Sequence, residues 1–271
     1  MNKKSNVIKK FFYSIYDVDS FRNFIKEGLT RAIVYALFLS IIVGGARGFI
    51  QTIKFNNYLE STIDYLKDDK YQFTIENNKL DIQTSPIKVR KSEISIYVDK
   101  DVTLNDVESI ESDISNEGAY LIILQDGVVA KSGLGDEISA SRLEFKYSEM
   151  NSNYITNNNS AIQYLDSIRW TTIGVIISLM IMKDFIFCIT LSVIIAFLTM
   201  IPSRLLKSNL AVKELISLSI YAFTLPNILV LILNIIIPDV NFDTAIMIGT
   251  LAYTYLLIRH IKIQNEDDIK L

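Results

Sequence analysis

Apolar residues in this chain gather into a few long runs, separated by sequence of ordinary polarity. Residues 32–50 form the first run, in which Arg47 is the only charged residue, and residues 215–237 form another that contains Pro226. Residues 241–258 form a shorter run that ends at Arg259. Each run is long enough to cross a hydrocarbon core about 30 Å thick as a helix. The pattern predicts three transmembrane helices, with a kink at Pro226.

A fourth apolar run, residues 173–201, is interrupted only by Lys183 and Asp184. As a single helix it would be about 43 Å long, which exceeds the bilayer core. Two spans joined at Lys183 would leave the first too short to cross. We therefore expect one span over residues 185–201 within the segment 168–202, whose first part, residues 168–182, either extends that helix outward or lies along the interface.

Basic residues indicate which ends of the spans face the cytoplasm. They outnumber acidic residues in the segment 1–31, and they recur in the loop 203–214 and at the start of the tail 259–271. Four spans place all three segments in the cytoplasm, together with both termini. The acidic segment 51–167 is then expected on the other side of the membrane. The polar N-terminal segment is unlike a cleavable signal, so we expect the first span to be retained.

The segment 51–167 has the pattern of a small folded domain. Residues 53–69 have apolar residues near helical spacing and predict a helical stalk. Asn105 is expected to cap a helix that ends at Gly118. The linker 151–160 leads back to the membrane. Alternating segments predict strands at 71–75, 79–82, 93–98, 119–124, 128–130 and 142–147, with hairpin turns at Asn77–Asn78 and Gln125–Gly127.

The predicted fold class is a membrane protein with four transmembrane α-helices and a small extracytoplasmic α+β domain inserted between the first and the second. Half of the residues are apolar, and the mean hydropathy is +0.28. Such values agree with several bilayer-buried segments.

Polar side chains inside the apolar runs are the candidate functional residues. Lys183 and Asp184 are the least expected pair, because charges at membrane depth are costly and often mark ion or proton paths. The simpler interpretation places them near the outer interface, with the lysine reaching water, and it applies to Arg47 as well. Asn227 and Asn234 are more simply hydrogen-bonding partners between helices.

A kink at Pro226, beside Asn227, could also open a small polar site. The membrane residues selected for a functional role are Lys183, Asp184, Pro226, Asn227 and Asn234.

The chain offers little for catalysis. Asp136, flanked by Gly133 and Gly135, matches the aspartate motif of intramembrane proteases, but it lies in the polar segment without a partner aspartate in a span. His260 is the only histidine, and Cys188, the only cysteine, lies in an apolar run. These counts argue against a catalytic triad, a disulfide framework and a His/Cys metal site. We predict no catalytic residue, cofactor or metal.

The remaining motifs have simple explanations. The sequence Asn158–Ser160 matches a glycosylation sequon, which an asparagine-rich linker produces easily by chance. The basic N-terminus is explained by membrane orientation, so no nucleic-acid partner is expected. The bilayer itself is the first expected partner.

Two segments resemble one bacterial family. They are residues 11–35, with FFYSIY at 11–16, Phe21-Arg22 and TRAIVY at 30–35, and residues 218–229, LSIYAFTLPNIL. Both are similar to bacterial membrane proteins grouped as domain of unknown function 1189, and the order of spans and outer domain is similar over nearly the whole chain. The later segment is also similar, less closely, to Yip1-like membrane proteins. The resemblance implies a multi-pass protein of the bacterial cell membrane.

Some members of that family are labelled maltodextrin utilization proteins. The leading hypothesis is a membrane protein without catalytic activity, an accessory, scaffold or sensor whose outer domain binds a partner such as an oligosaccharide transporter or another membrane protein. The rival hypothesis is a small oligomeric transporter or channel, based on Lys183, Asp184, Asn227 and Asn234. An intramembrane enzyme has only Asp136 in its favour.

Overall fold

The computed structural model describes residues 6–91, 94–114, 119–131, 142–149, 155–206, 208, 210–237 and 240–270. Asp136 and Gly118, to which the sequence analysis gave roles, lie outside these residues. The chain forms two compact units. We call Met1–Lys54 together with Ile173–Leu271 the helical unit, and Phe55–Thr172 the sheet unit.

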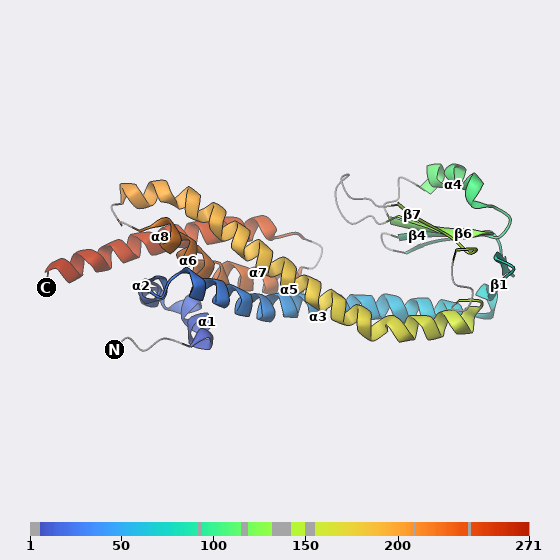
Figure 1. Cartoon of the computed structure of the whole chain (residues 1–271), viewed down its shortest axis with the longest axis horizontal. Coiled ribbons are helices and arrows are strands. Elements are labelled where there is room, and N and C mark those ends of the chain that lie inside the picture. The colour runs from blue at the N-terminus through green and yellow to red at the C-terminus, as the bar shows by residue number, and fades with distance from the viewer. Residues whose placement is uncertain are drawn as a thin grey trace. The chain divides into compact units, whose positions relative to one another are not determined.

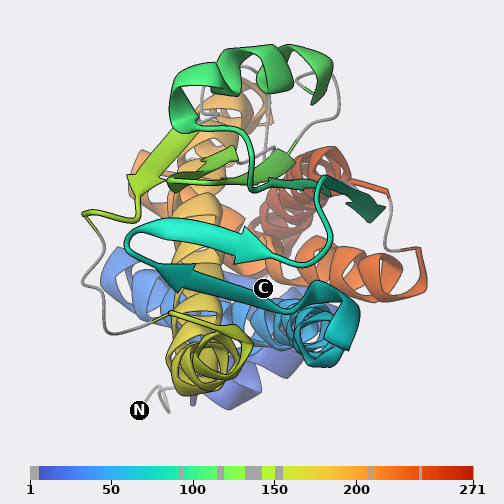
Figure 2. The same cartoon turned by 90° about the vertical axis from the view of Figure 1, so that its right-hand side faces the viewer.

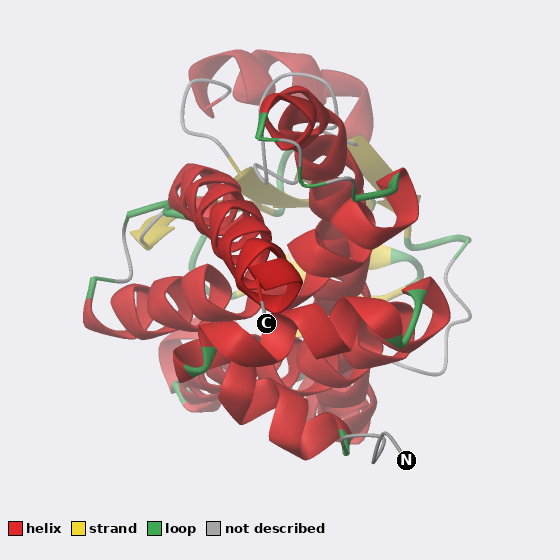
Figure 3. Ribbon diagram, turned by 90° about the vertical axis from the view of Figure 1, so that its left-hand side faces the viewer, coloured by secondary structure: helices red, strands yellow, loops and turns green. Residues whose placement is uncertain are grey.

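Helices make up the described part of the helical unit (Figures 1 and 3). They are α1 (Val7–Tyr16), α2 (Phe21–Lys26), the first part of α3 (Leu29–Lys67), the second part of α5 (Asn158–Leu205), α6 (Val212–Ala222), α7 (Thr224–Ile236) and α8 (Asp243–Lys270). Four helical segments are long and apolar enough to cross a membrane: Leu29–Lys67, Asn158–Leu205, Val212–Ile236 and Asp243–Ile263. The four predicted apolar helices are therefore present.

The apolar run 173–201 and the segment 168–182 before it belong to one helix, α5, without a break. Of the two arrangements expected for residues 168–182, the structure has the one in which they extend the second long helix. In the same way, α3 continues from the first apolar run through residues 53–67, where the stalk was predicted. The last helix, α8, continues past residue 258, where the predicted span ends.

The helix that contains Pro226 is interrupted, as predicted. Its two parts, α6 and α7, meet at Phe223. Because proline has no N–H group, Pro226 cannot donate to the carbonyl of Ala222 four residues earlier. Regular bonding resumes at the next residue, where Asn227 N donates to Phe223 O at 3.1 Å. The proline packs against α8, where a Cβ on Gly249 would lie 3.1 Å from Pro226 Cβ.

Two glycines allow α3 and α5 to approach closely. A Cβ on Gly44 would lie 2.9 Å from Ile181 Cα, and one on Gly48 would lie 2.9 Å from Ile177 Cα, whereas Gly45 has nothing within 4 Å. Residues four apart lie on one face of a helix, and paired small residues at this spacing let the backbones of membrane helices meet. This close approach was not among the predictions.

The sheet unit is an α+β domain whose strands come after the first long helix in the sequence and before the second (Figure 2). Its strands are β1 (Phe73–Glu76), β2 (Lys79–Ile82), β3 (Ile87–Lys91), β4 (Ile94–Asp99), β5 (Ala119–Leu124), β6 (Gly127–Lys131) and β7 (Arg142–Lys146). The five strands β3 to β7 form one sheet in sequence order, and β1 pairs with β2 separately. Only β4 and β5 are parallel among these pairs of described strands, and α4 (Val107–Ile114) connects them.

Both faces of the five-stranded sheet are apolar. On β5, Tyr120 and Ile122 pack with Val107 of α4, while Ile123 points to the opposite face. This alternation follows from the two-residue period of a strand. The β1–β2 hairpin packs on the second face through Leu80 and Ile82. The strand β3 was not predicted, whereas the other strands lie where the alternating pattern placed them.

The two predicted hairpin turns are present, for different reasons. Asn77 and Asn78 have φ values of 53° and 61°, which is the conformation of a type I′ turn. Gly127 instead begins β6, where a Cβ would lie 2.4 Å from Leu104 Cδ1. Glycine is needed there because another segment packs directly against the backbone.

The predicted helix cap at Asn105 is wrong. Asn105 lies inside a 3-10 turn, Leu104–Asp106, whose preceding residue is Thr103, and α4 begins after that turn. The reason is a tertiary contact, since Leu104 N donates to Asp126 Oδ1 at 2.8 Å. This bond holds the turn against the β5–β6 hairpin, so the local capping pattern does not decide where the helix starts.

Candidate functional site

A buried polar triad joins three helices of the helical unit. Arg47 of α3 donates from Nη1 to Asp184 Oδ1 at 2.5 Å and from Nη2 to Asn227 Oδ1 at 2.8 Å. Asn227 Nδ2 lies 3.4 Å from Asp184 Oδ2, which closes the triangle. The side chains of Asp184 and Arg47 are 1% and 20% exposed. The guanidinium thus supplies both the opposite charge and two donors to groups that have little contact with solvent.

The triad lies well inside the long helices. Asn227 is in α7, which ends at Ile236, and the intervening residues correspond to about 14 Å along the helix axis. Asp184 is at the same level because it bonds to Asn227 and Arg47. An ion pair at this depth is costly unless its members are hydrogen-bonded to one another, as they are here.

A cleft of about 270 Å³ begins at the triad. Four parts of the helical unit contribute to its wall: α3 from Arg47 to Lys54, α5 near Lys183, α7 near Asn234, and the segment 240–243 before α8. Arg47 Nε and Asn234 Oδ1 are buried and have no hydrogen-bond partner among the described residues. The cleft therefore combines charged groups with polar atoms whose bonding capacity is unused.

The structure brings four of the five predicted membrane residues to this one place. Asp184 and Asn227 belong to the triad, and Lys183 and Asn234 line the cleft with Asp184. Pro226 does not line the cleft and packs against α8 instead. Arg47 was predicted only to lie near the interface, and its partners were not predicted.

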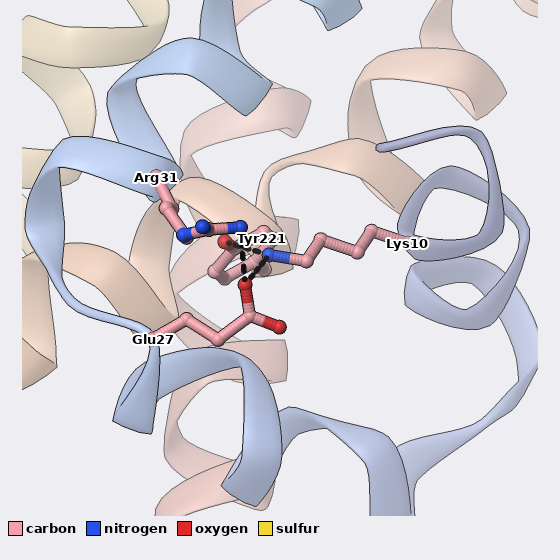
Figure 4. A network of polar contacts seen from close by, with 4 residues as sticks. All are labelled: Lys10, Glu27, Arg31 and Tyr221. Carbon is pink, nitrogen blue, oxygen red and sulfur yellow. Dashed lines mark hydrogen bonds and ion pairs between the residues drawn. The ribbon is translucent and has the colours of Figure 1, made fainter. Parts of the chain in front are cut away.

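A second buried charge, on Lys10, joins the N-terminal helix α1 to other parts of the helical unit (Figure 4). Lys10 Nζ lies 2.8 Å from Glu27 Oε2 and 3.2 Å from the Tyr221 hydroxyl, and Arg31 also approaches Glu27 at 3.4 Å. Lys10 is 2% exposed. Its ammonium lies 5.4 Å from the centre of the Tyr221 ring, within the range of a cation–π contact. These contacts fix α1 against α6.

The sheet unit contains an apolar cavity of about 450 Å³. Its wall is formed by the end of α3, the β1–β2 hairpin and the second face of the five-stranded sheet, with Ile96, Ile123 and Val128 among the lining residues. Cavities of this size that are lined mainly by apolar side chains are typical of small-molecule sites.

Tyr147 gives this cavity a polar group. It lines the wall and is 5% exposed, and its hydroxyl has no hydrogen-bond partner among the described residues. Burial raises the pKa of Tyr147, and the charge of Asp126 acts in the same direction. The hydroxyl therefore stays protonated and can donate a hydrogen bond or accept one.

A polar cluster lies on the α4 side of the same unit. Glu111 Oε1 accepts from Arg142 Nε and from the Tyr120 hydroxyl, each at 2.8 Å. Burial acts to raise the pKa of Glu111, but the hydrogen bonds from Arg142 and Tyr120 outweigh it and hold that pKa below its ordinary value. Burial and the Glu111 hydrogen bond raise the pKa of Tyr120 to about 12. This arrangement ties α4 to β5 and β7.

The formal glycosylation sequon begins at a buried residue. Asn158 Nδ2 donates to Leu66 O at 2.7 Å and to Tyr71 O at 3.1 Å, and its Oδ1 accepts from Phe73 N at 2.8 Å. The amide nitrogen that a glycan would modify is thus already bonded to the protein backbone. Within the described part of the chain, no three His, Cys, Asp or Glu side chains are placed to hold a metal ion.

Four helices of spanning length and an α+β domain between the first two are consistent with a multi-pass membrane protein. The family model described as protein of unknown function (DUF1189) matches residues 8–258, so the chain belongs to that family. This match confirms the resemblance seen in residues 11–35 and 218–229. No curated protein and no solved structure matches the chain.

Proposed function

We propose that this protein is a non-enzymatic accessory or sensor protein of the bacterial cell membrane, whose sheet unit binds an apolar group outside the cytoplasm. The cavity in the sheet unit carries this proposal, because about 450 Å³ of space is lined mainly by apolar side chains. The buried, unpartnered hydroxyl of Tyr147 supplies one polar contact that can orient the bound group.

The apolar wall of the cavity also affects how the maltodextrin label of some family members can be interpreted. A sugar needs many hydrogen-bond partners, and its hydroxyl groups would lose their bonds to water against this apolar wall. A role near maltodextrin uptake would therefore depend on contact with a transporter protein rather than on a sugar in the cavity. An apolar side chain of such a partner, or an apolar small molecule, suits the wall.

The proposed placement of the sheet unit outside the cytoplasm rests on the basic residues that flank the long helices. Single cysteines in a Cys188→Ser background would test it with a membrane-impermeant maleimide on intact cells. We expect labelling at Glu144→Cys in β7, which is exposed, and none at the exposed position Lys9→Cys in α1. The reverse pattern would contradict the proposal.

A cavity-filling variant tests binding. Val128→Phe adds a ring to the cavity wall, whereas Leu143→Phe changes an exposed position on β7. After crosslinking in intact cells, a C-terminal tag is used to recover bound proteins and apolar small molecules. We expect the bound protein or small molecule to be recovered with the wild type and with Leu143→Phe, but not with Val128→Phe. Equal recovery from all three folded proteins would refute the proposed role of the cavity.

The polar cleft supports a second candidate function, a small oligomeric transporter or channel. The observation that favours it is the Arg47–Asp184 pair, which lines a cleft between long apolar helices. Purified protein in liposomes would be tested for movement of ions and sugars, with Asp184→Asn as the variant. Flux that Asp184→Asn abolishes would favour this candidate, and liposomes that move neither would exclude it for these solutes.

A further inference from the structure

The cleft of the helical unit has the location of a lipid headgroup site. Its wall includes the region where α7 ends, at Ile236, and α8 begins, at Asp243. The loop residues Val240 and Asn241 line it as well. Such helix ends lie at the level of the lipid headgroups when the helices cross a bilayer.

The cleft has more basic than acidic side chains in its wall, which favours binding of an anion. Arg47, Lys54 and Lys183 line it, with Asp184 and Asp243 as the acidic residues. The charge of Asp184 is already paired with Arg47. Neither Lys54 nor Lys183 has a carboxylate within ion-pair distance in the described ranges, so an anion in the cleft would meet two lysine charges that no such pair neutralises. The carboxylate of Asp243 opposes this attraction in part.

One side chain in the wall of the cleft has an unused acceptor. Asn234 Oδ1 is buried and has no donor among the described residues. Leaving such a group unsatisfied is costly. A hydroxyl group on a lipid headgroup can donate to this amide oxygen.

The remaining wall is apolar. Ile50, Phe187 and Leu231 line the cleft beside the polar groups. These side chains provide a surface for the first carbons of an acyl chain. A free phosphate would leave that surface without a partner, which favours a lipid over a soluble anion.

From these observations we infer that the cleft binds the headgroup of an anionic phospholipid that carries both a phosphate and a hydroxyl group. Lys54 and Lys183 attract the phosphate, and Asn234 Oδ1 accepts from the headgroup hydroxyl. This inference does not depend on the apolar cavity of the sheet unit.

Native mass spectrometry of the full-length protein, released from detergent micelles that contain defined lipids, tests the inference. We expect the wild type to retain phosphatidylglycerol and to lose phosphatidylcholine. The double variant Lys54→Gln/Lys183→Gln should lower phosphatidylglycerol retention by about fivefold or more for each lysine removed. Lys213→Gln is the matched control, because it removes an exposed lysine near the start of α6.

A second variant tests the hydroxyl contact. Asn234→Leu should weaken retention of phosphatidylglycerol but not of phosphatidic acid, whose headgroup has no glycerol hydroxyl. Equal retention of phosphatidylcholine, or an equal loss in Lys213→Gln, would overturn the inference. Displacement of the lipid by millimolar inorganic phosphate or glycerol phosphate would also overturn it, since the anion would then be soluble.

Discussion

Arg47 and Asp184 come from helices that are far apart in the sequence, and they form an ion pair in which Nη1 and Oδ1 are 2.5 Å apart. The shared partner Asn227 bonds to both residues. The pair thus connects α3, α5 and α7 at one point. Three helices that share a buried charge pair cannot separate there without leaving a charge unpaired.

Removal of one member of this pair should be more harmful than removal of both. We expect Asp184→Leu to lower the free energy of unfolding by about 3–5 kcal/mol, because it leaves the Arg47 charge buried without its partner. The double variant Arg47→Met/Asp184→Leu should recover much of that loss. Denaturant unfolding in detergent measures both. A double variant as unstable as the single one would show that the charges do not act as a pair.

The close approach of α3 and α5 predicts different results for neighbouring glycines. Gly44→Ala would place a methyl group 2.9 Å from backbone atoms of α5, and we expect a loss of about 1–3 kcal/mol as the helices shift. Gly45→Ala meets nothing within 4 Å and should be neutral, or stabilising by up to about 1 kcal/mol. Thermal unfolding of the two variants is the measurement. Equal effects would mean that the helices do not cross at Gly44.

The buried lysine of α1 should hold the N-terminal helix in place. Lys10→Met removes the bonds to Glu27 and Tyr221, while Glu27 keeps Arg31 as an ionic partner. We expect a loss of about 1–3 kcal/mol and faster proteolysis within α1. Lys9→Met, at an exposed neighbouring position, is the control. Identical cleavage rates in the two variants would contradict a fastening role for Lys10.

The lowered pKa of Glu111 predicts a pH dependence of the sheet unit. Its cause is the hydrogen bonding to Arg142 and Tyr120, which outweighs the opposing effect of burial. Because the folded pKa lies below the unfolded value, the stabilisation is present above the unfolded pKa and is lost as the pH falls through the folded pKa.

Thermal unfolding of the full chain between neutral pH and about pH 3 would measure this loss. Glu111→Gln should remove the corresponding part of the pH dependence, whereas Glu108→Gln, at an exposed position of α4, should leave it. If the two variants had the same pH profile, the assigned hydrogen bonds would not control the ionisation of Glu111.

Local patterns in the sequence predicted most of the elements. Apolar runs gave the long helices, and Asn77–Asn78 gave a turn because asparagine tolerates positive φ. The strand β3 was missed although Ile87 and Val89 alternate with polar residues and both line the apolar cavity. Asn105 failed as a helix cap because the turn that contains it is fixed by a hydrogen bond from Leu104 N to the side chain of Asp126, which is distant in sequence.

The site was harder to predict than the elements. Asp184 and Asn227 were selected because polar groups are unusual in apolar helices, a property of each residue alone. Their association with Arg47 depends on how three helices pack, which no short pattern records. One usable signal was overlooked, since Gly44 and Gly48 have the spacing of closely packed membrane helices and lie beside Arg47.

The amide of Asn158 joins the start of α5 to the end of α3 and to the beginning of β1. Within the sheet unit, the chain therefore enters and leaves the part that contains the strands through segments that are fastened to one side chain. An inserted domain whose two connections to the rest of the chain are joined in this way can fold as an independent unit. In related chains the domain could then lengthen, shrink or be exchanged while the long helices on either side keep their sequence.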